Sequence, residues 1–169
     1  MRRVDPALRA LRRLGRAGLA VLLLSLAGLT ACASAPSAPP RPEARAVVAH
    51  VNEIRASQGL APLKPHRQLF AAARAHARDQ ARAGRISHTG TDGSALPLRL
   101  RRAGYAPAAA GENVASGWRR PADVAQGWWE SPGHRENLLR PSATEVGVGL
   151  AEAEGGRAYW TLIVASPAS

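Results

Sequence analysis

The chain has 169 residues, with 23 Lys and Arg against 12 Asp and Glu, a formal net charge of +11, and one cysteine. A single cysteine excludes an internal disulfide and the zinc sites that need two or more thiolates. The length is typical of one domain, and the sequence has no Walker loop, no H-E-x-x-H motif and no G-x-S-x-G elbow.

The N-terminus has the pattern of an export signal. Six arginines in residues 1–16 precede an uncharged apolar run over 17–29, which is too short to span a bilayer as a mature helix. The run ends in a Leu-Thr-Ala-Cys sequence at Cys32 that resembles a bacterial lipobox. We therefore expect residues 1–31 to be a lipoprotein signal peptide. Acyl chains such as palmitate on Cys32 would then hold the exported protein at the cell membrane or the outer membrane. Ordinary cleavage that leaves a soluble protein is the alternative.

The segment after the signal separates it from the domain. Residues 33–42 are rich in Pro, Ala and Ser, so we interpret residues 32–42 as the lipidated cysteine and a semi-extended linker. Residues 43–169 are then one domain without internal repeats. About half of the excess positive charge leaves with the signal, and the remainder either favours anionic envelope surfaces or forms a solvated basic face. Export argues against a nucleic-acid partner, and we expect a monomer.

The domain shows helices first and strands later. Apolar residues at helical spacing predict four helices, over 43–58, 66–83, 95–102 and 121–130. Alternation and a continuous apolar run predict two strands, over 146–150 and 159–165. Gly155-Gly156 between the two strands suits a hairpin connection. Helices followed by antiparallel strands indicate an α+β fold.

Three segments place polar residues where they could meet a ligand. They are a turn-rich loop with His88, a Gly-Glu-Asn segment with Glu112 that leads into a short extended stretch, and a third segment that contains Ser131 and His134. Ser131 suits a helix N-cap, with its hydroxyl engaged by backbone N–H groups, and Pro132 suits the first helical position. The helix dipole should then keep His134 neutral near pH 7, able to bind a metal ion or accept a proton.

Other polar and aromatic residues are interpreted as structural. His76 lies close to the apolar stripe of the helix over 66–83, so we expect it to pack there. Of the adjacent Trp128 and Trp129, only one can face the core. A further group of basic residues is expected to face solvent: Arg99, Arg101 and Arg102.

The chain resembles the CAP superfamily, in its bacterial SCP-like extracellular branch. The resemblance rests on five segments that occur in the family's order: SHTGTDG, GENVASGW, WWESPGHRENLL, EVGVGL and YWTLIVA. It covers nearly all of residues 43–169. It implies a three-layer α-β-α sandwich with an antiparallel sheet.

The resemblance also implies a polar cavity to which His88, Glu112 and His134 contribute. Eukaryotic members carry a further Glu three residues after a Trp, and Ser131 occupies that position here. Glu130 lies one residue before it and is a further candidate for the cavity. With Ser131 in place of the second Glu, the predicted cavity contains His88, Glu112, His134 and the hydroxyl of Ser131.

Three functions remain open at this stage. The first is a lipid-anchored binding or interaction module whose cavity takes a lipid, a cell-wall fragment or a divalent cation. The second is a hydrolase of the cell envelope, such as a protease or esterase. His88, Glu112 and His134 would hold Zn²⁺ or another divalent cation, or Ser131 would act with His134 as base. The third is a polar cluster that only stabilises the fold. The engaged hydroxyl expected of an N-cap favours the binding module.

Overall fold

The computed structural model describes residues 39–168. The predicted signal peptide, Cys32 and most of the predicted linker lie outside the described residues, so these assignments stay predictions. Among the described residues, no helix combines the length and the hydrophobicity needed to cross a bilayer.

The described chain confirms the predicted helices and strands and adds further elements. In chain order the elements are α2 (Pro42–Ser57), β1 (Lys64–Pro65), α3 (Arg67–Ala83), α4 (Leu96–Arg102), β2 (Pro107–Ser116), α5 (Pro121–Glu130), α6 (Pro132–Leu138), β3 (Glu145–Glu152) and β4 (Ala158–Pro167). The sequence did not predict β1, which contains a proline, or the full length of β2. The first half of β2 is Pro-Ala-Ala-Ala-Gly, which lacks the β-branched and aromatic residues typical of strands.

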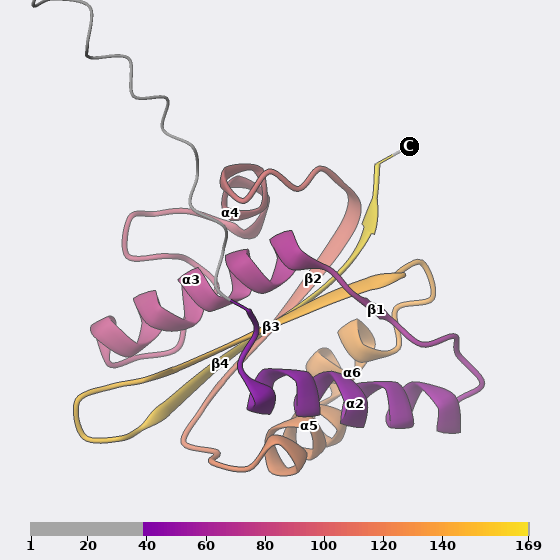
Figure 1. The fold of residues 1–169 in the computed structure, drawn as a ribbon, viewed down its shortest axis with the longest axis horizontal. Coiled ribbons are helices and arrows are strands. Elements are labelled where there is room, and N and C mark those ends of the chain that lie inside the picture. The colour runs from indigo at the N-terminus through magenta and orange to yellow at the C-terminus, as the bar shows by residue number, and fades with distance from the viewer. Residues whose placement is uncertain (1–38, 169) are drawn as a thin grey trace, which may run out of the picture. The chain divides into compact units, whose positions relative to one another are not determined.

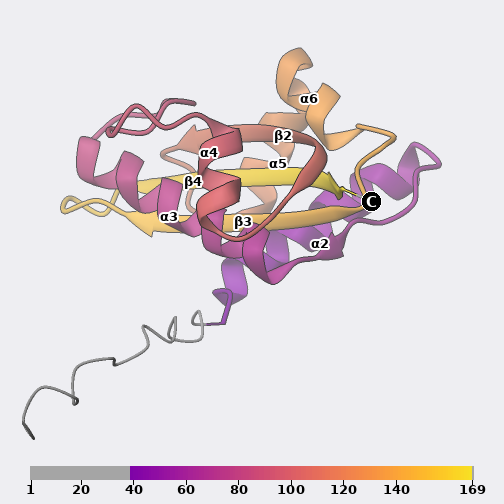
Figure 2. The ribbon, with the colours of Figure 1, turned by 90° about the horizontal axis from the view of Figure 1, so that it is seen from above.

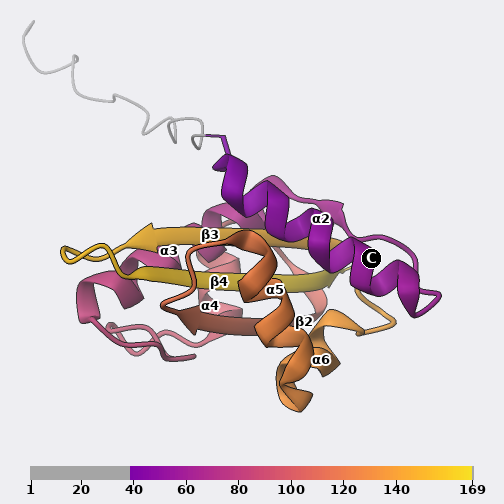
Figure 3. The same ribbon diagram turned by 90° about the horizontal axis from the view of Figure 1, so that it is seen from below.

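The elements form three layers. The sheet has the strand order β1-β3-β4-β2. The β3–β4 and β4–β2 pairs are antiparallel, and the two residues of β1 pair parallel to β3. Helices α3 and α4 cover one face of the sheet, α2 and α5 cover the other, and α6 lies beside the edge strand β2 (Figures 1, 2 and 3). The α-β-α sandwich is therefore confirmed.

The central strand β4 is buried on both faces, as its continuous apolar sequence predicts. Trp160 and Leu162 pack into the cluster on the side of α2 and α5, whereas Ile163 and Ala165 pack with α3 and α4. Trp128 of α5 is buried in the first cluster, and its neighbour in sequence is only partly buried against it. The expectation that one tryptophan of this pair faces the core is confirmed.

Two glycines of β3 let α3 approach the sheet closely. An ideal Cβ on Gly147 would lie 2.2 Å from the carbonyl carbon of Leu69, and one on Gly149 would lie 2.2 Å from the carbonyl oxygen of Ala73. Neither contact is possible for a real side chain without moving the helix backbone. These glycines therefore fix how α3 packs on the sheet, and α3 supplies residues to the polar site described below.

A buried arginine ties the end of α2 to the chain around the end of α6. Arg55 is 1 % exposed, and it donates hydrogen bonds to the carbonyl oxygens of Ala61, Leu138 and Arg140 at 2.9, 2.8 and 3.2 Å. Burial lowers the pKa of Arg55 from its usual value. The contacts hold the C-terminal end of α6, and His134 lies in the first turn of that helix.

Candidate functional site

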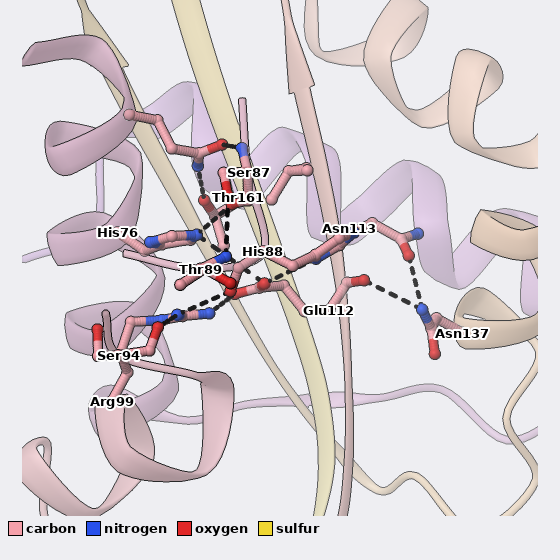
Figure 4. A network of polar contacts seen from close by, with 12 residues as sticks. His76, Ser87, His88, Thr89, Ser94, Arg99, Glu112, Asn113, Asn137 and Thr161 are labelled. Atoms are coloured by element: carbon pink, nitrogen blue, oxygen red, sulfur yellow. Dashed lines mark hydrogen bonds and ion pairs between the residues drawn. The ribbon is translucent and has the colours of Figure 1, made fainter. Parts of the chain in front are cut away.

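Polar side chains from α3, α4, the loop between them, α6 and the sheet meet around Glu112 in β2 (Figure 4). Only 4 % of the Glu112 side chain is exposed. Because successive side chains of a strand point to opposite faces, Glu112 points toward α3 and α4 while Asn113 points toward α6. A carboxylate buried in this way is stable only with charged or hydrogen-bonded partners.

The main partner of Glu112 is Arg99 of α4. Arg99 Nη2 donates to Glu112 Oε2 at 2.6 Å, and Arg99 Nη1 donates to the carbonyl oxygens of Ser94 at 2.6 Å and His88 at 3.0 Å. The guanidinium therefore neutralises the carboxylate and holds the loop before α4. Arg99 also lines a pocket of about 470 Å³ between α3 and α4.

The expectation that Arg99 faces solvent is wrong, whereas Arg101 and Arg102 are exposed as expected. The helical spacing of α4 could have predicted that Arg99 is buried. Residues 96, 99, 100 and 103 form one stripe, and Leu96, Leu100 and Ala103 all pack inward on it. Arg99 belongs to the same stripe, so its charge had to find a buried partner.

His88 is the exposed partner of Glu112. Its Nδ1 lies 2.9 Å from Glu112 Oε1, and 60 % of its side chain is exposed. A carboxylate can only accept a hydrogen bond, so Nδ1 carries the hydrogen and donates it. Nε2 is then the ring nitrogen left for a ligand. The structure thus brings together two of the residues singled out in the sequence.

His76 of α3 completes the buried side of the network, a role that the sequence did not indicate. It is 1 % exposed, its Nε2 donates to the carbonyl oxygen of Ser87 at 2.8 Å, and the same atom lies 3.9 Å from Glu112 Oε1. One turn later, Gln80 accepts from the Ser87 N–H at 3.2 Å and donates to Thr161 Oγ1 at 2.9 Å. Two side chains four residues apart on α3 therefore fix the loop that carries His88.

His134 lies in α6, where its backbone contacts the Asn113 side chain of β2. Asn113 Nδ2 donates to the carbonyl oxygen of His134 at 3.0 Å, and Asn137 Nδ2 donates to Asn113 Oδ1 at 2.9 Å. Burial lowers the pKa of His134, and the charge of His88 lowers it further. The direction agrees with the expectation of a neutral ring, and burial is its main cause.

Gly111 has a steric role in the Gly-Glu-Asn stretch. An ideal Cβ at this position would lie 2.2 Å from Asn137 Oδ1. The absence of a side chain lets Asn137 reach over β2, where its Nδ2 also donates to the carbonyl oxygen of Glu112 at 3.1 Å. The glycine therefore sets the distance between α6 and the strand that carries Glu112.

Ser131 and Glu130 are not joined to this network. Ser131 is the N-cap residue of α6, but it forms no side-chain cap hydrogen bond, so the expectation of an engaged hydroxyl is wrong. Glu130 is exposed at the end of α5 and accepts from Gln126 Nε2 at 2.8 Å. In the described chain, neither side chain is hydrogen-bonded to His88 or His134.

The arrangement does not fit a metal centre formed by His88, Glu112 and His134. Within residues 39–168, no group of three or more His, Cys, Asp or Glu side chains is placed so that it could hold a metal ion. One oxygen of Glu112 accepts from His88 and the other accepts from Arg99. No step proposed below therefore passes through Zn²⁺ or another cation.

Buried His76 should make the domain less stable in acid. Burial holds the folded-state pKa of His76 below the value of 6.5 expected in an unfolded chain. The folded state therefore binds fewer protons, so this contribution is present above pH 6.5 and is lost as the pH falls through the folded-state pKa. Urea denaturation between about pH 7.5 and about pH 5.5 should show a smaller loss of unfolding free energy in His76→Gln than in wild type. The loss should persist in His50→Gln, and equal losses in all three proteins would contradict this role.

Comparison with known proteins identifies a family. The model of the CAP family, described as the cysteine-rich secretory protein family, matches residues 48–164. The uncharacterized protein YkwD of Bacillus subtilis is 37 % identical over 109 residues, which cover 64 % of this chain and 42 % of that protein. The uncharacterized membrane protein YlbC of the same organism is 32 % identical over 110 residues, which cover 65 % of this chain and 30 % of that protein. The chain thus spans less than half the length of these curated relatives.

Solved structures share the fold. An extracellular protein with an SCP domain from Bacillus anthracis aligns with a TM-score of 0.65 and 28 % identity, over 76 % of this chain and 45 % of that one. An outer surface protein of Borrelia burgdorferi aligns with a TM-score of 0.68 and 19 % identity, over 73 % of this chain and 92 % of that one. Since the family model covers more than half of the sequence, the chain belongs to the CAP family of cysteine-rich secretory proteins.

Proposed function

We propose that this protein is an exported CAP-domain protein, anchored by acylated Cys32, that binds a cell-wall fragment through His88 and His134. Export is supported by the basic and apolar N-terminal sequence and by the similarity to an extracellular SCP-domain protein. In this proposal the network around Glu112 positions the imidazoles, and the protein carries out no reaction.

One observation carries the proposal: both oxygens of Glu112 are engaged. Oε1 accepts from His88 and Oε2 accepts from Arg99, and the carboxylate is almost fully buried. A carboxylate held in this way orients its partners and is poorly placed to act as a base or a nucleophile on a substrate. The group that meets a ligand is therefore the exposed ring of His88.

The ligand class follows from the polar groups at this surface. The free Nε2 of His88 and the neutral ring of His134 can exchange hydrogen bonds with hydroxyl and amide groups. A peptidoglycan fragment carries both groups on its sugars and its peptide. An acyl chain would instead need an apolar lining, which an imidazole pair with a buried carboxylate does not provide.

The test is calorimetric titration of the protein with disaccharide-peptide fragments of peptidoglycan. His88→Ala and His134→Ala should each raise the dissociation constant by about tenfold, as expected for one lost hydrogen bond. The matched control is His50→Ala, because His50 lies on α2 and its partner is Glu53 at 3.1 Å. Equal affinities of the His50 and His88 variants would overturn the proposal, as would binding of Zn²⁺ or phospholipid vesicles without binding of the fragments.

The same samples test the hydrolase alternative. After incubation, mass spectrometry of the fragments should find them intact. Cleavage by wild type that is lost in Ser131→Ala or Glu112→Gln would replace the binding proposal with hydrolysis. No hydrogen bond joins Ser131 to His134 in the part of the chain that the structure describes, which is why binding is preferred.

A further inference from the structure

One end of the domain carries exposed apolar side chains. Among the described residues, the exposed large hydrophobic side chains are Ile86, which is 46 % exposed, and Trp118, which is 45 % exposed. Ile86 follows α3, and Trp118 lies between β2 and α5. Figures 1 and 3 show the end of α3, the β2–α5 loop and the β3–β4 hairpin at the same end of the molecule.

Trp118 is held in place although its ring is exposed. Buried Trp160 donates from Nε1 to the carbonyl oxygen of Trp118 at 2.9 Å, and the Gly117 N–H donates to the carbonyl oxygen of Ala158 at 2.9 Å. An ideal Cβ on Gly127 of α5 would lie 3.2 Å from Trp118 Cζ2, so the indole rests against the helix at a glycine. The exposed part of the ring is therefore a fixed feature of the surface.

Three arginines lie in the segments that form this end of the molecule. Arg85, Arg119 and Arg157 are exposed in the same segments, and none of them has a carboxylate partner in the described chain. Arg157 Nη2 lies 3.8 Å from an ideal Cβ on Gly117, which places the hairpin beside the Trp118 loop. Glu154 is an exposed acid at this end, so the arginines are in excess.

The polypeptide from the predicted anchor enters the domain beside β3 and the first half of α3. Glu152 is the last residue of β3, and its Oε1 lies 3.8 Å from Arg41 Nη1. Pro39 is seven residues after Cys32, and an extended chain of that length reaches about 25 Å at most. A domain anchored at Cys32 is therefore held within reach of the bilayer.

We propose that Ile86, Trp118, Arg85, Arg119 and Arg157 form a membrane-contact surface for anionic phospholipid headgroups. The proposal rests on the anchoring of Cys32 in the proposed function. A tryptophan ring is amphipathic and is stable at the level of the headgroups, and each nearby arginine is attracted by the negative surface potential of the membrane. Contact at this surface would orient the domain and hold His88, two residues after Ile86, on the membrane-proximal side.

The test uses residues 33–169 without acyl chains, because this region contains the three hydrophobic clusters of the described residues. The protein should cosediment with vesicles of phosphatidylglycerol and phosphatidylcholine, and added salt should release it. Replacing both Arg119 and Arg157 with Gln should lower the partition coefficient by about thirtyfold. The charge-matched control is Arg67→Gln with Arg101→Gln, which removes two exposed arginines from α3 and α4 away from this surface.

Fluorescence distinguishes specific contact from general attraction. Brominated lipids should quench part of the tryptophan emission, and Trp118→Phe should remove that part. Equal loss of binding in the two arginine pairs, or quenching that survives in Trp118→Phe, would overturn the membrane-contact surface. Binding to vesicles of phosphatidylcholine alone that is as strong as binding to the mixed vesicles would overturn the proposed preference for anionic lipids.

Acyl labelling of Cys32 in cells tests the anchor separately, with Cys32→Ser as the control. Vesicle binding without acylation would overturn the anchor and leave the surface supported. Acylation without vesicle binding would overturn the surface and leave the anchor supported.

Discussion

Replacing Arg99 with Met should lower the free energy of unfolding by about 3–5 kcal/mol. The substitution keeps most of the apolar stem of the side chain but removes the guanidinium that pairs with Glu112 at 2.6 Å. The carboxylate is left buried without its cationic partner, and the carbonyl oxygens of Ser94 and His88 also lose a donor. Urea denaturation at neutral pH measures the loss.

A double mutant separates the unpaired charge from lost packing. Arg99→Met combined with Glu112→Met should be more stable than Arg99→Met alone, because no buried charge then lacks a partner. The matched control is Arg101→Met, an exposed arginine of the same helix, which should change stability by less than about 0.5 kcal/mol. Equal effects of the Arg99 and Arg101 substitutions would show that Glu112 does not depend on Arg99.

Gly149→Ala should be nearly as damaging, at about 3 kcal/mol, although it adds only a methyl group. The new Cβ would lie 2.2 Å from the carbonyl oxygen of Ala73, which belongs to the backbone of α3 and cannot rotate away. The helix must shift, and His76 shifts with it. A lower melting temperature together with changed His76 resonances is the expected result.

Gly155→Ala is the control for Gly149→Ala. Gly155 lies in the β3–β4 turn, and an ideal Cβ there has no atom within 4 Å. The free energy of unfolding of Gly155→Ala should stay within about 0.5 kcal/mol of wild type. If Gly149→Ala behaves in the same way, the close packing of α3 on β3 is wrong.

Sequence periodicity predicted the helices and the two long C-terminal strands well. The helix predicted over 43–58 spans Pro42–Ser57, and the strand predicted over 159–165 lies within Ala158–Pro167. These segments bury a continuous stripe or run of apolar residues, so their pattern determines their structure. The strand Pro107–Ser116 was only partly foreseen, because tertiary pairing with β4 forms it in spite of low strand propensity.

The site was predicted less completely than the fold. The family resemblance pointed to His88 and Glu112, which are hydrogen-bonded to each other. Arg99 was missed because it was interpreted from its residue type alone, although helical spacing placed it on an inward face. The expectation that His76 packs inward is confirmed, but its contacts with Ser87 and Glu112 were not foreseen. Which side chains pair across the sheet depends on contacts between residues far apart in the chain, and no local pattern contains that information.

The central claim is that the imidazoles of His88 and His134 belong to one site. NMR titration of the His134 ring in wild type and in His88→Gln tests it most directly, because Gln keeps a donor for Glu112 but never carries a charge. The charge of His88 lowers the pKa of His134, so this pKa should rise when His88 is replaced. A His134 pKa that stays the same in the two proteins would show that the rings do not share a site, and the proposed binding surface would fail with it.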